Sequence, residues 1–468
     1  MQPVEVLQKY FGHPSFRPLQ LEIVNSVLEE RETLTVLPTG GGKSVCFQVP
    51  GLMLPGMTLV ISPLISLMQD QVAGLQKKGV AAEFLNSSLS KTKAQEIEQK
   101  VLAGQINFLY TSPERLKNER FRKLCSQIQI SLIAIDEAHC ISMWGPDFRP
   151  SYRVIGRVID SLPQRPRLIA LTATATTKTM EDIITSLKMR QLQIFRQPIF
   201  RPNLNILVKT GLNTLERQLT IKRLLDHHRG QQGIIFCVTR KQTLKLSKLL
   251  SADYYHGGLP NVDRKKIQDK FISGQTRVLC ATNAFGMGVD KSDIRFVIHS
   301  QTPASIEDYY QEIGRAGRDG LSSNCYLLSS TKDFRIHYQL NKSKRFIVAK
   351  YKWWRLNKLR EFVDSDDCRL KLLHHYFDQS WPEKCQNCDH CLRIDIGDSV
   401  SDRQLHSQFQ PLISQNILSP FQLRGILAYR PTTLDELLLV PGIGRGWIAK
   451  WYNHAHVIIH SFDPPKTY

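Results

Sequence analysis

One short glycine-rich segment combines the residue types that proteins use to hold a phosphate chain. It runs Thr39-Gly40-Gly41-Gly42-Lys43-Ser44 and follows an apolar run, residues 33–37, that predicts a buried strand. Its glycines would let backbone N–H groups wrap the phosphates, Lys43 would contact the β- and γ-phosphates, and Ser44 would bind Mg²⁺. Leu37 stands where the usual pattern has its first glycine. Taken alone, the segment also fits a glycine-rich turn that happens to carry a lysine.

Two adjacent carboxylates, Asp136 and Glu137, end a second apolar run, residues 132–135. Ligands bind at the carboxyl ends of the strands in open α/β sheets. Asp136 would hold Mg²⁺, directly or through water, and Glu137 would orient and deprotonate an attacking water. The pair strengthens the prediction that the glycine-rich segment serves phosphate chemistry.

Two arginines far along the chain, Arg315 and Arg318, are three residues apart in a segment that predicts a helix, residues 311–320. At this spacing they would share one face of the helix. An arginine from a second lobe can reach a γ-phosphate and stabilise the charge that develops during transfer. Taken alone, such arginines more often form surface salt bridges.

Four of the ten cysteines are clustered: Cys368, Cys385, Cys388 and Cys391. Two Cys-x-x-Cys steps share Cys388, and with Cys368 they supply four thiolates for a tetrahedral, structural Zn²⁺. Four reduced cysteines without a metal are the alternative. The other cysteines stand singly in predicted helices and strands and are interpreted as small buried apolar residues.

Strands and helices must position these groups. Apolar runs alternate with helix-like segments, are interrupted at a linker-like stretch, residues 198–202, and then resume. The pattern predicts an α/β protein with two lobes built on parallel sheets, followed by a small helical zinc-binding subdomain and a short all-helical domain. The predicted boundaries are 1–200 and 201–334 for the lobes, 335–394 for the zinc-binding subdomain, 395–412 for a linker, and 413–468 for the last domain.

Charge and composition narrow the class of protein. Of the 468 residues, 42% are hydrophobic and 22% are charged, as is ordinary for a globular protein. The formal net charge of +20 is not ordinary. The excess of cations predicts attraction to polyanions, most simply nucleic acid, although a merely soluble basic surface would have the same charge. No apolar run is long enough to span a membrane, and residues 1–10 lack a signal-peptide core. We therefore expect a cytoplasmic protein, associated with the nucleoid if the source is bacterial.

Two segments have compositions suited to single-stranded nucleic acid. Beyond the carboxylates, Trp144 and Phe148 adjoin Arg149 in a Gly/Pro loop, which favours stacking on bases over a locally packed cluster. The hydroxyls of Thr172 and Thr174, which follow another predicted strand, could link the γ-phosphate to the nucleic-acid groove.

A third segment, residues 335–360, contains nine Lys/Arg and no acidic residue, interleaved with aromatics. This composition suits contact with a nucleic-acid backbone combined with base stacking. A solvated basic helix is the alternative.

The order of these motifs resembles the RecQ family of DNA helicases in superfamily 2. The segments that carry the resemblance are residues 16–20, 39–44, 136–139, the loop around 144, 172–176, 284–288 and 309–320. The resemblance extends over roughly residues 10–330. It implies two RecA-like lobes that clamp ATP and step along single-stranded DNA with 3′-to-5′ polarity. Gln20, whose amide can pair with adenine, is assigned with Arg17 and Asp290 to the nucleotide site.

The chain departs from the family pattern in two places. The winged-helix domain that usually follows the zinc module is missing, and residues 413–468 resemble a short helicase-and-RNase-D C-terminal (HRDC) domain instead. Met143 and Pro146 stand where the family commonly has glutamine and histidine. The coupling between DNA binding and ATP hydrolysis is therefore expected to be weaker or to run through Arg149.

The sequence as a whole predicts an ATP-dependent DNA helicase that uses ATP, Mg²⁺ and Zn²⁺. Its expected substrates are single-stranded and tailed or branched DNA in recombination and repair, and a single-strand-binding protein or another repair factor is a candidate partner. A translocase or annealing ATPase that unwinds weakly is one alternative, and a non-catalytic nucleic-acid-binding scaffold is another. The choice between DNA and RNA comes from the family resemblance, since the lobe motifs do not separate the two sugars. The oligomeric state is not defined.

Overall fold

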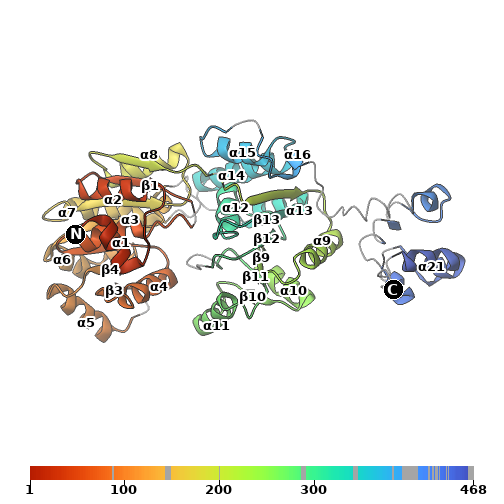
Figure 1. Ribbon diagram of the computed structural model, residues 1–468, viewed down its shortest axis with the longest axis horizontal. Coiled ribbons are helices and arrows are strands. Elements are labelled where there is room, and N and C mark those ends of the chain that lie inside the picture. The colour runs from red at the N-terminus through yellow and green to blue at the C-terminus, as the bar shows by residue number, and fades with distance from the viewer. Residues whose placement is uncertain are drawn as a thin grey trace.

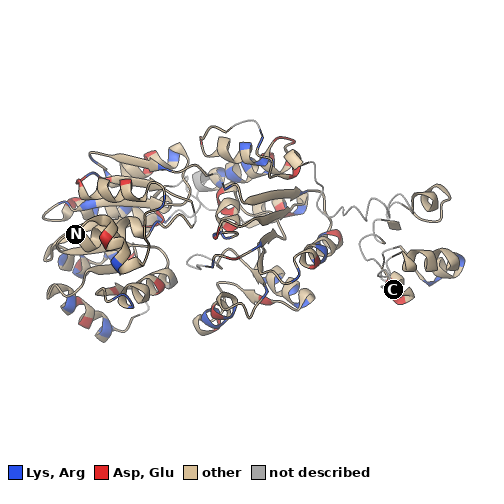
Figure 2. Ribbon diagram, in the orientation of Figure 1, with Lys and Arg blue, Asp and Glu red and all other residues tan. Residues whose placement is uncertain are grey.

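The protein consists of two α/β lobes side by side, a helical layer on the second lobe and a small helical module beyond it (Figure 1). The computed structural model describes residues 1–38, 40–86, 89–142, 149–199, 201–285, 291–340, 346–381, 384–392, 409–419, 422, 423, 426, 431, 433–438, 440 and 442–461. The predicted fold class, two parallel-sheet lobes followed by helical regions, is confirmed. Lys and Arg are spread over both lobes and the helical layer (Figure 2).

The first lobe contains a seven-stranded sheet whose paired strands all run parallel, in the order β3-β4-β2-β5-β6-β1-β7. The strands are β1 (Thr33–Val36), β2 (Met57–Ile61), β3 (Ala82–Leu85), β4 (Phe108–Thr111), β5 (Ile130–Ile135), β6 (Arg167–Thr172) and β7 (Gln193–Arg196). Ile133 and Ile135 of β5 face one core, whereas Leu132 and Ala134 face the other. Burial on both faces explains why such central strands are continuous apolar runs.

Helices cover both faces of this sheet. They are α1 (Pro3–Phe11), α2 (Gln20–Leu28), α3 (Val45–Met53), α4 (Ile65–Gln76), α5 (Lys91–Leu102), α6 (Glu119–Ser126), α7 (Ile155–Ser161) and α8 (Thr177–Leu187). Short 3₁₀ turns, η1 (Arg115–Lys117), η2 (Ala138–Ile141) and η3 (Pro150–Val154), complete the lobe. The loops at the carboxyl ends of β1 and β5 carry the glycine-rich segment and the carboxylate pair.

The second lobe repeats the plan with a six-stranded parallel sheet in the order β10-β11-β9-β12-β13-β8. Its strands are β8 (Leu204–Lys209), β9 (Gly233–Phe236), β10 (Asp253–Tyr255), β11 (Val278–Ala281), β12 (Phe296–His299) and β13 (Ser323–Leu328). Its helices are α9 (Thr214–His227), α10 (Arg240–Leu250), α11 (Asn261–Ile272) and α12 (Ile306–Ile313).

A helical layer packs on the second lobe. It consists of α13 (Thr331–Leu340), α14 (Phe346–Asp364), α15 (Arg369–Tyr376) and α16 (Asp389–Leu392). Leu359, Phe362 and Leu370 belong to the same buried cluster as Val297 and Ile306 of the lobe. The layer and the lobe therefore share one hydrophobic core.

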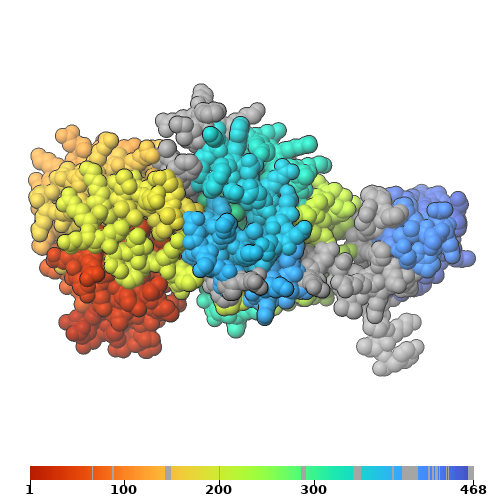
Figure 3. Space-filling model, turned by 90° about the horizontal axis from the view of Figure 1, so that it is seen from above, coloured from red at the N-terminus to blue at the C-terminus, as the bar shows by residue number. Residues whose placement is uncertain are grey.

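The C-terminal module has a core of its own. Phe409, Leu437, Ile458 and other apolar residues form it, around α19 (Leu434–Leu438), α20 (Arg445–Lys450) and α21 (Tyr452–His460). The module lies at the end of the molecule that is far from the first lobe (Figure 3). Among the residues that the structure describes, no helix is long and apolar enough to cross a membrane.

Candidate functional site

The glycine-rich segment connects β1 to α3, as predicted. At two of its positions the backbone conformation requires glycine. Gly40 has φ +84° and Gly42 has φ +74°, both in the left-handed region that favours glycine. A Cβ on Gly42 would lie 2.3 Å from Gln20 Nε2. The segment therefore forms a tight loop in front of the helix, and the backbone N–H groups at this end of α3 suit an anion. Thr39, assigned with it, lies outside the described residues.

Gln20 and Arg17 hold this phosphate loop from the start of α2. The Gln20 side chain is buried, and its Nε2 donates to the carbonyls of Gly41 (3.1 Å) and Gly42 (3.2 Å). Its Oε1 accepts the Arg17 backbone N–H (2.9 Å), and the Arg17 guanidinium donates to the Gly40 carbonyl. Both ends of the Gln20 amide thus bond within the protein, and its contact with adenine stays a prediction.

Asp136 lies at the end of β5, and its carboxylate is buried and oriented. Oδ1 accepts the Glu137 backbone N–H (3.0 Å), and Oδ2 accepts the Ser62 hydroxyl (3.3 Å). Burial, followed by the negative charge of Glu137, raises the pKa of Asp136 to about 7, while the charge of Lys43 opposes this shift. A buried carboxylate that is costly to ionise alone suits a hard cation that would compensate its charge.

Glu137 has a left-handed backbone, with φ +48° and ψ +47°, which is uncommon for a residue other than glycine. Its Oε2 is buried without a hydrogen-bond donor among the described residues, although His139 Nδ1 lies 3.3 Å away. A strained backbone and an unsatisfied carboxylate oxygen are typical of a functional position. Both features suit a group that accepts a proton from water.

His139 connects this carboxylate to the segment after β6, a link that the sequence analysis missed. Its Nδ1 lies 2.9 Å from Thr172 Oγ1, and the Thr172 hydroxyl donates to the Thr174 carbonyl (3.0 Å). Because the hydroxyl donates onward, Nδ1 carries the hydrogen and donates to Thr172. The Thr172 hydroxyl therefore contacts Glu137 through one imidazole, whereas the Thr174 hydroxyl is buried without a hydrogen-bond partner among the described residues and only the Thr174 carbonyl joins this chain of contacts. The presence of histidine directly after Asp136-Glu137-Ala138 was the available signal.

Arg315 and Arg318 lie in a turn, and the prediction that they share a helix face is wrong. Helix α12 ends at Ile313, and Gly317 has φ +55°. Arg201, a residue not singled out from the sequence, donates to the carbonyls of Gly314 (3.2 Å) and Ala316 (3.0 Å). Capture of these carbonyls by a side chain replaces the hydrogen bonds that would continue the helix.

The turn reaches the first lobe. The Arg318 Cγ lies 3.3 Å from the position that a Cβ on Gly40 would occupy. Burial, followed by the charge of Arg318, lowers the pKa of Arg315 to about 10, and the charges of Glu312 and Glu137 partly offset this. The structure thus brings the arginines, the phosphate loop and the carboxylate pair to one place between the lobes.

Gln71 is a second residue that the sequence analysis did not assign. Its Nε2, at the middle of α4, donates to Ser44 Oγ (3.2 Å). This bond orients the hydroxyl that we assigned to Mg²⁺. No local sequence signal marks the contact, since it joins residues 27 positions apart.

Several residues assigned to DNA or nucleotide are not described. Trp144, Phe148 and Asp290 lie outside the described residues. Arg149 is described, and its Nη1 donates to the Pro63 carbonyl (3.1 Å), directly before α4. Arg149 therefore contacts the segment that leads into the helix carrying Gln71.

The cysteine cluster forms a centre that fits zinc. The sulfur atoms of Cys368, Cys385, Cys388 and Cys391 all lie within 4.8 Å of one another. Tetrahedral Zn–S bonds of about 2.3 Å place sulfurs roughly 3.8 Å apart, and Cys385 Sγ lies 3.9 Å from Cys391 Sγ. A hydrogen bond from Cys385 lowers the pKa of Cys388 to about 5, toward the thiolate that zinc requires. The centre contacts the second lobe, because the Ile206 N–H donates to the Asn387 carbonyl (3.0 Å).

Three known families match the first lobe, the second lobe and the zinc-binding layer in turn. Residues 17–183 match the DEAD/DEAH box helicase family, residues 216–320 match the helicase conserved C-terminal domain, and residues 331–392 match the RecQ zinc-binding family. The zinc match covers all four clustered cysteines.

Individual proteins resemble most of the chain. The ATP-dependent DNA helicase RecQ of Haemophilus influenzae is 40% identical over 398 residues, covering 83% of this chain and 63% of that protein. The probable ATP-dependent DNA helicase RecS of Bacillus subtilis is 44% identical and covers 72% of this chain and 68% of that protein. The chain spans about two thirds of the length of such relatives. Among solved structures, the helicase Lhr of Mycobacterium smegmatis shares the fold, with a TM-score of 0.58, 20% identity, and coverage of 72% of this chain and 50% of that chain.

Proposed function

Because the chain belongs to the RecQ family of superfamily 2 helicases, we propose that it is an ATP-dependent DNA helicase. In this proposal ATP hydrolysis between the lobes drives movement along single-stranded DNA with 3′-to-5′ polarity and separates the strands of a duplex. Recombination and repair intermediates, with single-stranded tails or branches, are its proposed substrates. A cytoplasmic location and a single-strand-binding protein as partner belong to the same proposal.

The contact between the lobes carries this proposal. Arg318 from the second lobe packs against Gly40 of the phosphate loop. Glu137 of the first lobe lies close enough for its negative charge to raise the pKa of Arg315. A site completed by groups from both lobes would assemble and open as the lobes move. ATP binding and hydrolysis would then be converted into motion of one lobe against the other.

Each residue has a defined task in hydrolysis. Lys43 and the loop N–H groups would bind the β- and γ-phosphates of ATP. Water would attack the γ-phosphorus and lose its proton to Glu137 Oε2, while the bond to the β-bridging oxygen breaks and ADP leaves. Arg315 and Arg318 would stabilise the negative charge on the transferring group. Mg²⁺, bound beside Asp136 and Ser44, supplies further neutralisation of the phosphates.

The route from Glu137 to Thr174 would couple this chemistry to DNA. Thr172 ends β6 and Thr174 follows it, and His139 joins Thr172 to Glu137 by contacts of 2.9 and 3.3 Å. A bound DNA strand that shifts the segment at Thr172 would move the His139 imidazole and, through it, the Glu137 carboxylate. Single-stranded DNA as the ligand is supported by the structure of Lhr of M. smegmatis, which is bound to ssDNA and AMP-PNP.

The choice of nucleic acid can be tested by hydrolysis. ATP turnover should be measured with DNA and RNA strands of equal length and sequence, with Lys43→Ala as the control that removes phosphate binding. The proposal predicts stimulation by DNA above stimulation by RNA, and loss of both in the variant. Equal or stronger stimulation by RNA would contradict the assignment of DNA, and hydrolysis that stays at background with either strand would favour a non-catalytic scaffold.

A further inference from the structure

We propose that the outer face of helices α13 and α14 is a second binding surface for single-stranded DNA, outside the site between the lobes. The α13–α14 face comprises Arg335, Tyr338, Lys350, Trp353 and Trp354. The inference rests on the proposed function only for the kind of substrate, since it concerns binding and involves no step of ATP hydrolysis.

Two adjacent tryptophans are exposed on this face. Trp353 is 42% exposed and Trp354 is 43% exposed. Large aromatic side chains that stay in solvent at neighbouring positions are unusual unless they bind something. Base stacking on such a ring is worth about 1–3 kcal/mol per base and tolerates any sequence.

Other rings orient both indoles. Tyr338 of α13 meets Trp353 edge to face, with centroids 6.1 Å apart, and its hydroxyl donates to Asn357 (3.1 Å). Trp354 stacks against Tyr351 (5.7 Å) and also against Tyr376 (6.2 Å). The indoles are thus partly ordered before any ligand arrives, which lowers the entropic cost of binding.

The helix that carries them is firmly anchored. Arg355 is buried and bonds Glu307 (3.2 Å) and the Ser305 hydroxyl at the start of α12. Leu356, Leu359 and Phe362 are buried on the inner side of α14. A ligand on the outer side would therefore contact a rigid platform.

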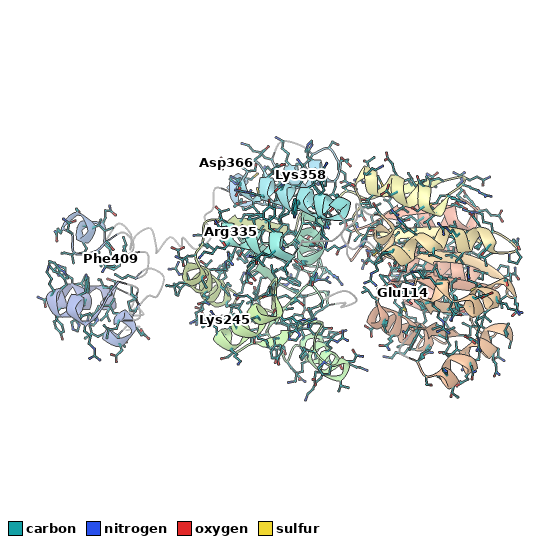
Figure 4. All side chains as sticks on the ribbon, turned by 180° about the vertical axis from the view of Figure 1, so that it is seen from behind. Glu114, Lys245, Arg335, Lys358, Asp366 and Phe409 are labelled. Atoms are coloured by element: carbon teal, nitrogen blue, oxygen red, sulfur yellow. The ribbon has the colours of Figure 1, made fainter. Side chains whose placement is uncertain are left out.

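Positive charge lies around the indoles. In the C-terminal half of α14, Lys358 pairs with Glu361 (2.7 Å) and Arg360 with Asp364 (3.4 Å). In the half that carries the indoles, Lys350 precedes Trp353 and Trp354 by three and four residues; it is exposed and forms no ion pair with any described residue. Arg335, labelled on α13 in Figure 4, is exposed and likewise has no ion pair within the described part of the chain. Glu307 and Asp308 of α12, together with Asp182 of the first lobe, are the acidic side chains whose charges act on Tyr351.

This combination favours a single strand over other polyanions. An unpaired strand offers bases with free faces and phosphates at short intervals, which match rings flanked by cations. A duplex keeps its bases stacked inside and would leave the indoles without a partner. An acidic protein segment would pair with Arg335 and Lys350 but would offer no base to stack on the exposed indoles.

The test is equilibrium binding of labelled oligothymidylates to the full chain without ATP. One strand should be short enough to be held by the lobes alone, and the other long enough to continue onto α14. The double variant W353A/W354A should bind the long strand roughly tenfold or more weakly and the short strand as the wild type does. The matched control K358A/R360A, on the same helix, removes side chains that are already paired and should leave both affinities unchanged.

Two further variants separate stacking and charge from structural damage. W353F/W354F retains ring faces and should recover most of the affinity. R335A/K350A should reduce the slope of log Kd against log salt concentration by roughly 1–2 for the long strand only. Unchanged binding of the long strand by W353A/W354A would overturn the proposal, and so would an equal loss for both strands. Neither result depends on whether the protein unwinds DNA.

Discussion

Arg318 of the second lobe lies against Gly40 of the phosphate loop, with its Cγ 3.3 Å from the position of a Cβ on that glycine. Gly40 has φ +84°, so a side chain there would be strained as well as crowded. The second lobe thus places a guanidinium directly at the loop proposed to hold the phosphates of ATP. This relationship makes the arginine turn a direct target for mutation.

Replacement of Arg318 by alanine should reduce kcat for ATP hydrolysis by about 100-fold or more, because a donor to the transferring group is lost. Nucleotide affinity should change by no more than roughly threefold, since the loop that binds the phosphates remains. Steady-state hydrolysis and fluorescent-nucleotide binding measure the two effects. Arg229→Ala, at an exposed position of the same lobe, is the control. A normal kcat in Arg318→Ala would contradict the role of Arg318 in ATP hydrolysis.

Replacement of Thr172 by valine should uncouple hydrolysis from DNA. The substitution keeps the side-chain shape and removes the hydroxyl that meets His139 and the Thr174 carbonyl. We expect the DNA-free rate to stay near that of the wild type, while stimulation by single-stranded DNA falls several-fold, as a lost buried bond of about 1 kcal/mol allows. Thr185→Val, on an exposed turn of α8, is the matched control. Full stimulation in Thr172→Val would show that the route through His139 is not used.

Loss of the zinc centre should weaken the second lobe. Cys385 and Cys388 belong to its hydrophobic cluster, and the Asn387 carbonyl bonds the Ile206 N–H of β8. Cys388→Ser should abolish stoichiometric zinc in a metal assay and lower the apparent Tm by about 5 °C or more. Cys125→Ala, at a buried thiol of the first lobe, should retain zinc. Normal zinc content in Cys388→Ser would contradict the assignment of the ligands.

Acid should destabilise the second lobe through buried histidines. Burial lowers the pKa of His337, whose Nε2 donates to the Thr302 carbonyl (2.7 Å). The native state keeps this imidazole neutral while the unfolded chain takes up a proton, so stability is lost as the pH falls below about 6.5. In urea titrations at several pH values, His337→Gln should show a smaller loss of stability on acidification than the wild type. The exposed His13→Gln should behave as the wild type, and an unchanged acid loss in His337→Gln would exclude this residue as a source.

Sequence reasoning identified the strands that are buried on both faces, because residues 132–135 of β5 and 168–171 of β6 are uninterrupted apolar runs. It missed β3 and β7, which lie at the edges of the first sheet and include Glu83, Gln193 and Arg196. Edge strands are covered incompletely, so polar side chains are tolerated there and the apolar signal is weak. It also missed β8 and β13, whose polar Asn205 and Asn324 bond each other across the pair (2.8 Å).

In the candidate site, too, some features were predicted from the sequence and others were missed. The phosphate loop, the carboxylate pair and the cysteine cluster were found because each is local in the sequence. The end of α12 before Arg315 was not, because Arg201, more than one hundred positions away, captures the carbonyls. Likewise, Gln71 contacts Ser44 because β2, which lies between them in the sequence, returns the chain so that α4 meets the phosphate loop. Contacts of this kind depend on the tertiary structure and leave no periodic signal.

The central claim is that this chain uses ATP to separate DNA strands, and unwinding of a tailed duplex tests it most directly. Strand separation should be compared for duplexes with a 3′ tail and with a 5′ tail, using the wild type and Glu137→Gln, which keeps the side-chain shape and removes the proton acceptor. The account predicts ATP-dependent separation of the 3′-tailed duplex alone, and its loss in Glu137→Gln. ATP hydrolysis stimulated by DNA without separation of either duplex would contradict a helicase and make the protein a translocase or remodelling ATPase.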